Sequence, residues 1–269
     1  MKKNIYQKHI PLKKFGQNFL IDKIIINNII QWINPKNSEV LVEIGPGLAA
    51  LTEPICNMVD SLIIIEIDSN LLELLKNKNF FSKLIIFNKN ALTFDYLKLF
   101  HNQKLIRIFG NLPYNISVSL IIYLFKKIYI IKDMHFMIQK EVADRLIATP
   151  GNKSYGRLSI LAQYYCHIKI IFNVLPESFF PIPKVYSVFV QLIPRKKYPI
   201  YVYDINILSY ITNIAFQKRR KILRHSLSSL FSVDKLITLG IDPTLRAENI
   251  SVLQYCKLAN YLFNNKCYN

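Results

Sequence analysis

The chain has 269 residues, of which 51% are apolar, and its 35 Lys and Arg residues against 17 Asp and Glu residues give a formal charge of +18. This length fits one large domain, or one domain with a small appendage, and the apolar share can build a sizeable core. The four cysteines contain no C-x-x-C pair, which argues against a zinc site or a disulfide framework, so we expect a cytoplasmic protein without a metal.

The positive charge has two interpretations. Such an excess usually indicates a polyanionic partner, most often a nucleic acid. Lys, Ile and Asn are heavily used along the whole chain, however, so biased composition can explain part of the charge without any function.

The first half of the chain alternates between helical and strand patterns. Residues 1–20 are expected to form a basic, partly mobile arm, without the continuous apolar run of a secretory signal. Helical spacing of apolar residues predicts helices at 21–33, 48–59, 68–77 and 117–128. Short apolar runs predict buried strands at 40–44, 61–67, 83–91, 105–109 and 134–139. This alternation is typical of the α/β class, with an open, mostly parallel sheet and helices on both faces.

The pattern changes after residue 139. Helices are predicted at 140–150 and 157–166, followed by strands at 168–174 and 185–193 that form an antiparallel hairpin at the end of the sheet. The longest apolar stretch, 119–138, is interrupted by charged residues, so no membrane span is expected. Prolines and charges in 194–204 mark a boundary, and helices are predicted at 205–231, 233–241 and 251–263. We therefore expect an α/β domain at 1–198 and a helical domain at 199–269.

Three predicted strands end in residues suited to a ligand that contains a nucleoside. Gly45 and Gly47 allow a tight turn and a close approach to the backbone, although Ala50 replaces the third glycine of a G-x-G-x-x-G fingerprint. Glu66 ends the next strand, at a spacing where a carboxylate can accept hydrogen bonds from ribose hydroxyls. Asn90 follows the third strand and could meet an adenine edge, but an ordinary turn asparagine fits the position equally well.

The stretch GNLPYNIS, residues 110–117, follows the fourth strand and so lies at the same rim of the predicted sheet. Asn111 offers an amide oxygen, and Pro113 stiffens the turn and can aim the Leu112 carbonyl inward. Tyr114 adds a flat face. Two acceptors beside a flat ring suit an aromatic amine, because they bind both amine hydrogens and leave the nitrogen lone pair free to attack an electrophile. A fortuitous Asn-x-Pro-Tyr loop is the alternative.

A basic segment, FQKRRKILRHS, lies in the predicted helix 205–231. Helical spacing would place Arg220 and Arg224 on one face with Lys221 beside them, and Arg219 adds a further charge. Such residues can hold phosphates and position an RNA. A solvated basic face in a lysine-rich protein is the alternative.

Eight motifs resemble, in order, those of the bacterial small-subunit ribosomal RNA adenine dimethyltransferase family, a family of class I S-adenosylmethionine-dependent methyltransferases. They are KKFGQNFL, VEIGPGLAALTEP, GNLPYNIS, MHFMIQKEV, YGRLSILAQYYC, FPIPKVYS, AFQKRRKILRHSL and GIDPTLRAENIS. The resemblance runs from about residue 13 to residue 263. It implies a Rossmann-like catalytic domain and a helical RNA-binding domain. It also implies a monomer that dimethylates two adjacent adenosines in the 3′-terminal hairpin loop of 16S rRNA, within a pre-30S particle.

The resemblance further assigns roles to matching positions. The cofactor-binding residues would be Asn18, Leu20, Gly45, Gly47, Glu66, Asn90 and Asn111. The residues around the target base would be Asn111, Leu112, Pro113, Tyr114 and Phe179. Tyr114 and Phe179 would sandwich the flipped adenine, and Arg219, Arg220, Lys221 and Arg224 would bind RNA.

Two positions depart from the family pattern. Asn90 stands where the family has Asp, and KVYS, with Tyr186, stands where it has KVDS. Asn90 keeps an oxygen that can accept and an amine that could reach a ring nitrogen, so we expect cofactor binding to be kept but weakened; nothing in the sequence explains Tyr186. Two other functions stay open: a ribosome-assembly factor whose methylation is secondary, and a related methyltransferase of large-subunit rRNA adenine.

Overall fold

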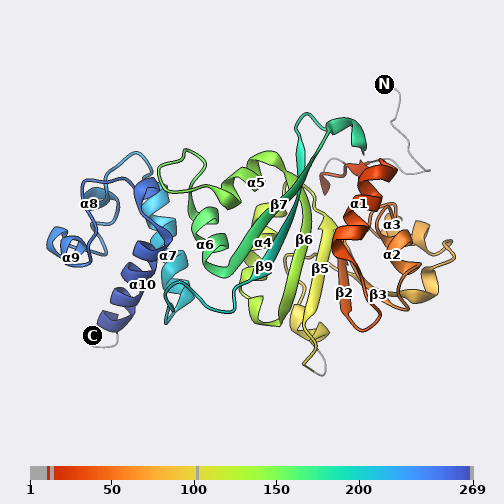
Figure 1. Ribbon diagram of the computed structural model, residues 1–269, viewed down its shortest axis with the longest axis horizontal. Coiled ribbons are helices and arrows are strands. Elements are labelled where there is room, and N and C mark those ends of the chain that lie inside the picture. The colour runs from red at the N-terminus through yellow and green to blue at the C-terminus, as the bar shows by residue number, and fades with distance from the viewer. Residues whose placement is uncertain (1–10, 13–14, 101–102, 267–269) are drawn as a thin grey trace. The chain divides into compact units, whose positions relative to one another are not determined.

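The computed structural model describes residues 11–12, 15–100 and 103–266, and a seven-stranded sheet is built from strands between residues 40 and 194 (Figure 1). The strand order is β4-β3-β2-β5-β6-β9-β7. The strands are β2 (Val40–Ile44), β3 (Leu62–Glu66), β4 (Leu84–Asn88), β5 (Ile106–Asn111), β6 (Ile131–Gln139), β7 (Cys166–Val174) and β9 (Ser187–Pro194). Pairing is parallel from β4 through β6, and β9 joins β6 antiparallel. The predicted α/β class, with a mostly parallel sheet, is confirmed.

Two short strands, β1 (Phe19–Leu20) and β8 (Phe179–Phe180), form a separate antiparallel pair. Part of the predicted N-terminal arm, residues 1–10 and 13–14, lies outside the described residues. The arm prediction is wrong for Phe19 and Leu20, because both are buried and paired with a segment about 160 residues away in sequence. Apolar burial therefore holds this part of the chain on the body of the protein.

The first four helices differ at their N-termini, since a side-chain cap is present in two of them. These helices are α1 (Lys23–Ile33), α2 (Thr52–Cys56), α3 (Ser69–Leu75) and α4 (Ser117–Phe125). Asp22 accepts hydrogen bonds from the backbone N–H groups of Ile24 and Ile25 in α1, and Asp68 accepts one from Asn70 in α3. The buried face of α1, with Ile29, Ile30 and Ile33, packs into the core beside Leu41 of β2.

The described chain forms two compact units. The first contains the described residues up to Ala143 together with Lys169–Pro194, and the second contains Asp144–Ile168 together with the described residues from Arg195 onward. The remaining helices are α5 (Lys140–Ile147), α6 (Arg157–Tyr165), α7 (Ile205–Gln217), α8 (Leu223–Ser226), α9 (Val233–Thr238) and α10 (Val252–Lys266). Single-turn 3₁₀ helices occur at η2 (Phe81–Lys83), η3 (Tyr96–Leu99), η4 (Ile128–Ile130), η5 (Pro176–Ser178) and η6 (Ala247–Asn249).

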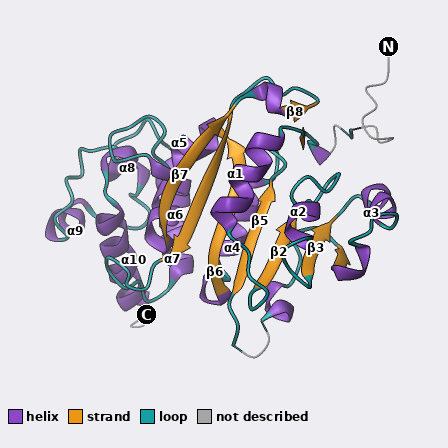
Figure 2. Cartoon of the chain, turned by 45° about the vertical axis from the view of Figure 1, so that its right-hand side comes forward, coloured by secondary structure: helices purple, strands orange, loops and turns teal. Residues whose placement is uncertain are grey.

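The second unit differs from the predicted domain 199–269 by the addition of Asp144–Ile168 and of residues 195–198. Helix α6 packs against both α7 and α10, and the buried Tyr155 hydroxyl donates to the Ile250 carbonyl at 2.9 Å. These contacts join segments that are separated by β7 and β9 in sequence (Figure 2). Within the described ranges, no helix combines the length and the apolar character needed to cross a membrane.

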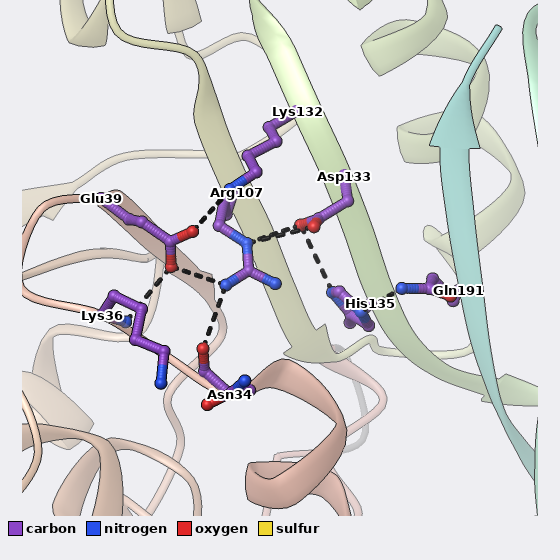
Figure 3. A network of polar contacts seen from close by, with 8 residues as sticks. All are labelled: Asn34, Lys36, Glu39, Arg107, Lys132, Asp133, His135 and Gln191. Carbon is purple, nitrogen blue, oxygen red and sulfur yellow. Dashed lines mark hydrogen bonds and ion pairs between the residues drawn. The ribbon is translucent and has the colours of Figure 1, made fainter.

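A buried polar network ties three strands together at the end of β5 that is remote from Asn111 (Figure 3). Nε of Arg107 donates to both carboxylate oxygens of Asp133, at 3.0 and 3.1 Å, and its Nη1 lies 2.6 Å from Glu39, directly before β2. His135 lies 3.5 Å from Asp133 and 3.0 Å from the Gln191 amide on β9. Burial lowers the pKa of His135 to about 4, although Asp133 opposes the shift.

Candidate active site

A cavity of about 320 Å³ lies at the carboxyl ends of β2, β3 and β5, where parallel sheets bind their ligands. Ten of the predicted site residues line it: Asn18, Leu20, Gly45, Gly47, Glu66, Asn90, Asn111, Leu112, Pro113 and Tyr114. They come from five segments that the sheet and the β1–β8 pair bring together. Further lining residues that the sequence did not single out include Phe15, Gln17, Glu43 and Asn115.

Two glycines allow the close packing that shapes the cavity. Gly47 has a φ of +56°, and a Cβ atom there would lie 3.1 Å from the Phe19 ring. Gly110, directly before Asn111, has a stricter requirement, because its Cβ would lie 2.3 Å from the Ile44 carbonyl oxygen. Strand β5 can therefore approach β2 closely only with glycine at this position, and that approach sets the location of Asn111.

Two carboxylates face the cavity from neighbouring strands. Glu66 ends β3, is 6% exposed, and accepts a hydrogen bond of 2.9 Å from the Asp68 backbone N–H. Burial raises its pKa, against the effect of the backbone donors around it. Glu43 of β2 is 2% exposed, and its Oε2 has no hydrogen-bond partner among the described residues.

Burial also raises the pKa of Glu43, to about 8, with Thr52 opposing the shift and the charge of Glu66 adding to it. A buried carboxyl with an unpartnered oxygen is costly in a fold unless a ligand meets it. Sequence reasoning missed Glu43; the available signal was a single carboxylate inside the apolar strand VLVEI.

Asn90 uses its side-chain oxygen within its own loop. Oδ1 accepts a hydrogen bond of 2.9 Å from the Leu92 backbone N–H, and the Asn90 carbonyl accepts one of 3.0 Å from Thr93. This is the turn geometry that the alternative interpretation foresaw, yet Asn90 also lines the cavity. The amide nitrogen is therefore the group that Asn90 can offer to a ligand.

The orientation of the Asn111 amide is fixed from the N-terminal segment. Its Nδ2 donates to the Asn18 carbonyl at 2.7 Å, so Oδ1 is the atom left to accept from a ligand. The Leu112 N–H donates to the Met137 carbonyl at 3.1 Å, which ties the loop to β6. The segment that carries Asn18 is held in turn by a 2.8 Å hydrogen bond from the Gln17 side chain to Asp68.

The two predicted stacking aromatics are placed differently. Tyr114 is half-buried, lines the cavity, and shares a 2.8 Å hydrogen bond with the Ser187 hydroxyl. Phe179 is fully buried in the core, is paired with Leu20, and is not among the lining residues. The sandwich of a base between Tyr114 and Phe179 therefore stays a prediction, and in this structure the Phe179 ring packs in the apolar core.

The predicted basic helix is interrupted. Helix α7 ends at Gln217 and α8 begins at Leu223, and between them Ile222 forms an isolated bridge with Arg246. The helical spacing argument for Arg220 and Arg224 is therefore wrong, although both side chains and Lys221 are exposed. Arg219 is engaged within its own unit, since its guanidinium lies 2.7 Å from Glu248 and also donates to the Lys153 carbonyl.

Comparison with known proteins identifies the family. Residues 10–264 match the family model described as Ribosomal RNA adenine dimethylase. The chain belongs to this family. The match confirms the family and the enzyme class, an rRNA adenine dimethyltransferase, that the motifs predicted.

Relatives of this ribosomal RNA adenine dimethylase cover nearly its whole length. The chain is 66% identical to the Ribosomal RNA small subunit methyltransferase A of Buchnera aphidicola subsp. Acyrthosiphon pisum, over 98% of this chain and 96% of the relative. It is 52% identical to the protein of the same name from Erwinia tasmaniensis, over 97% of each chain. A crystal structure of a dimethyladenosine transferase from Plasmodium falciparum has a TM-score of 0.75 and 26% identity, over 93% of this chain and 98% of that one.

Proposed function

We propose that this ribosomal RNA adenine dimethylase transfers methyl groups from S-adenosylmethionine to the N6 amines of two adjacent adenosines in the 3′-terminal hairpin loop of 16S rRNA. The names of the relatives, at 66% and 52% identity, support a small-subunit substrate. The amine chemistry is supported by one observation: Asn111 lines the cavity, and its side-chain oxygen is left to accept a hydrogen bond from a ligand. With such a substrate, we expect a monomer that acts on a pre-30S particle in the cytoplasm during small-subunit biogenesis.

The donor set of the cavity fits S-adenosylmethionine. The unpartnered Glu43 oxygen suits the ammonium of its methionine end, and Glu66 suits its ribose hydroxyls. The loop that contains Gly45 and Gly47 leaves room for a close backbone approach. Asn18, Leu20 and Asn90 also line the cavity. When bound, this cofactor supplies a methyl group that is already activated by its positively charged sulfur.

The residues of the chain then have to orient an amine. Oδ1 of Asn111 accepts one amine hydrogen and the Leu112 carbonyl accepts the other, which draws the nitrogen lone pair out of conjugation. Pro113 keeps the loop rigid, and the Tyr114 face stacks on the base and tolerates the positive charge that develops on it. In this mechanism, the rate enhancement comes from positioning and from fixed dipoles.

A methylation assay tests the proposal directly. Small-subunit particles that lack the modification are incubated with the protein and labelled S-adenosylmethionine, and the methylated bases are mapped. We expect two adjacent adenosines near the 3′ end of 16S rRNA to be labelled. Label on large-subunit rRNA would contradict the proposal and support a methyltransferase of large-subunit rRNA. Binding to the particle without any methyl transfer would also contradict it and would support an assembly factor.

The Asn111→Ala variant tests the role of the amide. We expect it to lose at least about 100-fold in transfer rate, because an oriented acceptor is removed, while particle affinity stays unchanged. Asn213→Ala is the matched control, since Asn213 is an exposed asparagine of α7. A fully active, folded Asn111→Ala protein would refute this assignment.

A further inference from the structure

Tyr114 is anchored at both ends by buried serines. Its hydroxyl lies 2.8 Å from Oγ of Ser187, and its backbone carbonyl accepts a 3.2 Å hydrogen bond from Oγ of Ser117. Both serines are fully buried. Burial raises the pKa of Tyr114, and Ser187 offsets part of the shift, so the hydroxyl stays protonated near neutral pH.

Ser187 is a fixed point of the sheet, whereas Tyr114 belongs to a loop. Ser187 is the first residue of β9 and pairs with Gln139 of β6 in antiparallel register. The Lys140 backbone N–H donates to the Tyr186 carbonyl at 2.9 Å, which fixes the peptide directly before Ser187. The hydrogen bond between the two side chains therefore ties the loop after β5 to a strand 73 positions further along the chain.

This hydrogen bond restricts the rotation of the Tyr114 ring, which would otherwise change the face that the ring offers for stacking. A half-buried ring on a loop can change its χ1 and χ2 angles, and each orientation presents a different plane to the cavity. The tyrosine oxygen lies on the χ2 axis, so a rigid, buried partner fixes χ1 through the position of that oxygen. The same partner restricts the ring plane, because a phenolic hydroxyl forms its hydrogen bonds close to the plane of its ring. Stacking on a base needs only the ring, so the hydroxyl explains why tyrosine serves here where phenylalanine would also stack.

We propose that Ser187 is a positioning residue that holds the Tyr114 ring in the plane required for stacking on the target base. This inference rests on the proposed function, since it deepens the role of Tyr114. It gives the final residue of KVYS a role. The Tyr186 side chain is 53% exposed, and only the backbone of that residue supports Ser187, so the departure from KVDS leaves the contact intact.

A double-mutant cycle tests the coupling. Ser187→Ala, Tyr114→Phe and the double variant are compared with the wild type in single-turnover methylation over a series of small-subunit particle concentrations that reaches saturation. We expect each single variant to lower the transfer rate about threefold to tenfold, with an unchanged KM for the particle. The double variant should be no slower than either single variant, because both substitutions remove the same hydrogen bond.

The cycle separates positioning from a purely structural role. If Ser187 served only stability, Ser187→Ala would slow transfer equally in the Tyr114→Phe background, and such additivity would overturn the proposal. If the Ser187→Ala variant does not fold, the Tyr114→Phe variant alone tests the proposal. A transfer rate of Tyr114→Phe equal to that of the wild type would then refute the inference. Ser226→Ala is the matched control, a buried serine of the second unit whose hydroxyl has no partner among the described residues. A wild-type protein that methylates no adenosine would refute the proposed function instead.

Discussion

Asn90 illustrates how a single side-chain atom changes what the cavity offers to a ligand. Its oxygen is occupied by the Leu92 N–H, which leaves a donor, the amide nitrogen, toward the cavity. An aspartate in the same turn would accept from Leu92 with one carboxylate oxygen and present the other as an acceptor. An adenine edge carries an exocyclic amine that needs an acceptor, so asparagine loses that hydrogen bond and can only donate to a ring nitrogen.

We therefore expect Asn90→Asp to tighten S-adenosylmethionine binding by roughly threefold to tenfold, the range that one hydrogen bond supplies. Isothermal titration calorimetry of the wild type and the variant measures the change. Asn213→Asp, which adds the same charge at an exposed position of α7, controls for the general attraction of a cationic ligand. Equal affinities of the wild type and the Asn90→Asp variant would show that residue 90 does not contact the adenine.

At the scale of elements, the break between α7 and α8 separates basic residues that the sequence grouped together. Arg219 is only partly exposed and pairs with Glu248 of η6, so it joins two segments of its own unit. Arg220, Lys221 and Arg224 are exposed. Phosphate binding needs cations that are not already paired, so the exposed residues are the better candidates for RNA contacts.

Neutralising both exposed arginines, as Arg220→Gln with Arg224→Gln, should flatten the salt dependence of RNA binding. The slope of log K against log salt should become smaller by roughly 1.5, if each arginine contacts one phosphate. Arg219→Gln should leave the slope nearly unchanged and lower the midpoint of thermal unfolding, because Glu248 loses its partner. Filter binding across a salt series and calorimetry provide the two measurements. An unchanged slope in the double variant would remove these residues from the RNA interface.

At the scale of the whole molecule, two buried titratable groups, on the strands either side of β5, give stability opposite responses to pH. The pKa of Glu43 is raised to about 8, so between its ordinary value of 4.5 and that value the folded chain holds a proton that the unfolded chain has lost. Stability from this group falls as pH rises. The pKa of His135 is lowered to about 4 from 6.5, so the unfolded chain binds the proton first and stability falls as pH falls.

The two effects oppose each other between about pH 4.5 and 6.5, and Glu43 acts alone of the pair between about 6.5 and 8. In that upper range, the free energy of unfolding of the wild type should decline by up to about 1.4 kcal/mol per pH unit because of Glu43, and Glu43→Gln should remove this decline. His135→Gln should instead remove the loss of stability below pH 6.5. Urea unfolding of the cofactor-free proteins at several pH values measures both. A Glu43→Gln curve parallel to the wild type between pH 6.5 and 8 would contradict the assignment.

Local patterns in the sequence determined much of this protein. Strands such as VLVEI and helices such as the one capped by Asp68 follow from apolar runs, periodicity and capping, which act over a few residues. Gly45, Glu66 and Asn111 could be assigned to one rim, because the carboxyl ends of parallel strands must share an edge. The eight sequence motifs indicated the family.

Only the tertiary structure decided the contacts between distant segments. It engaged Arg219 with Glu248, buried Phe179 against Leu20, and joined Asp144–Ile168 to the C-terminal helices. It also oriented the Asn111 amide through the Asn18 carbonyl and the Tyr114 ring through Ser187. The physical reason is the same in each case: a side chain contacts whichever partner folding brings within a few ångströms, and residues separated by about 30 to 160 positions leave no periodicity from which that contact could be predicted.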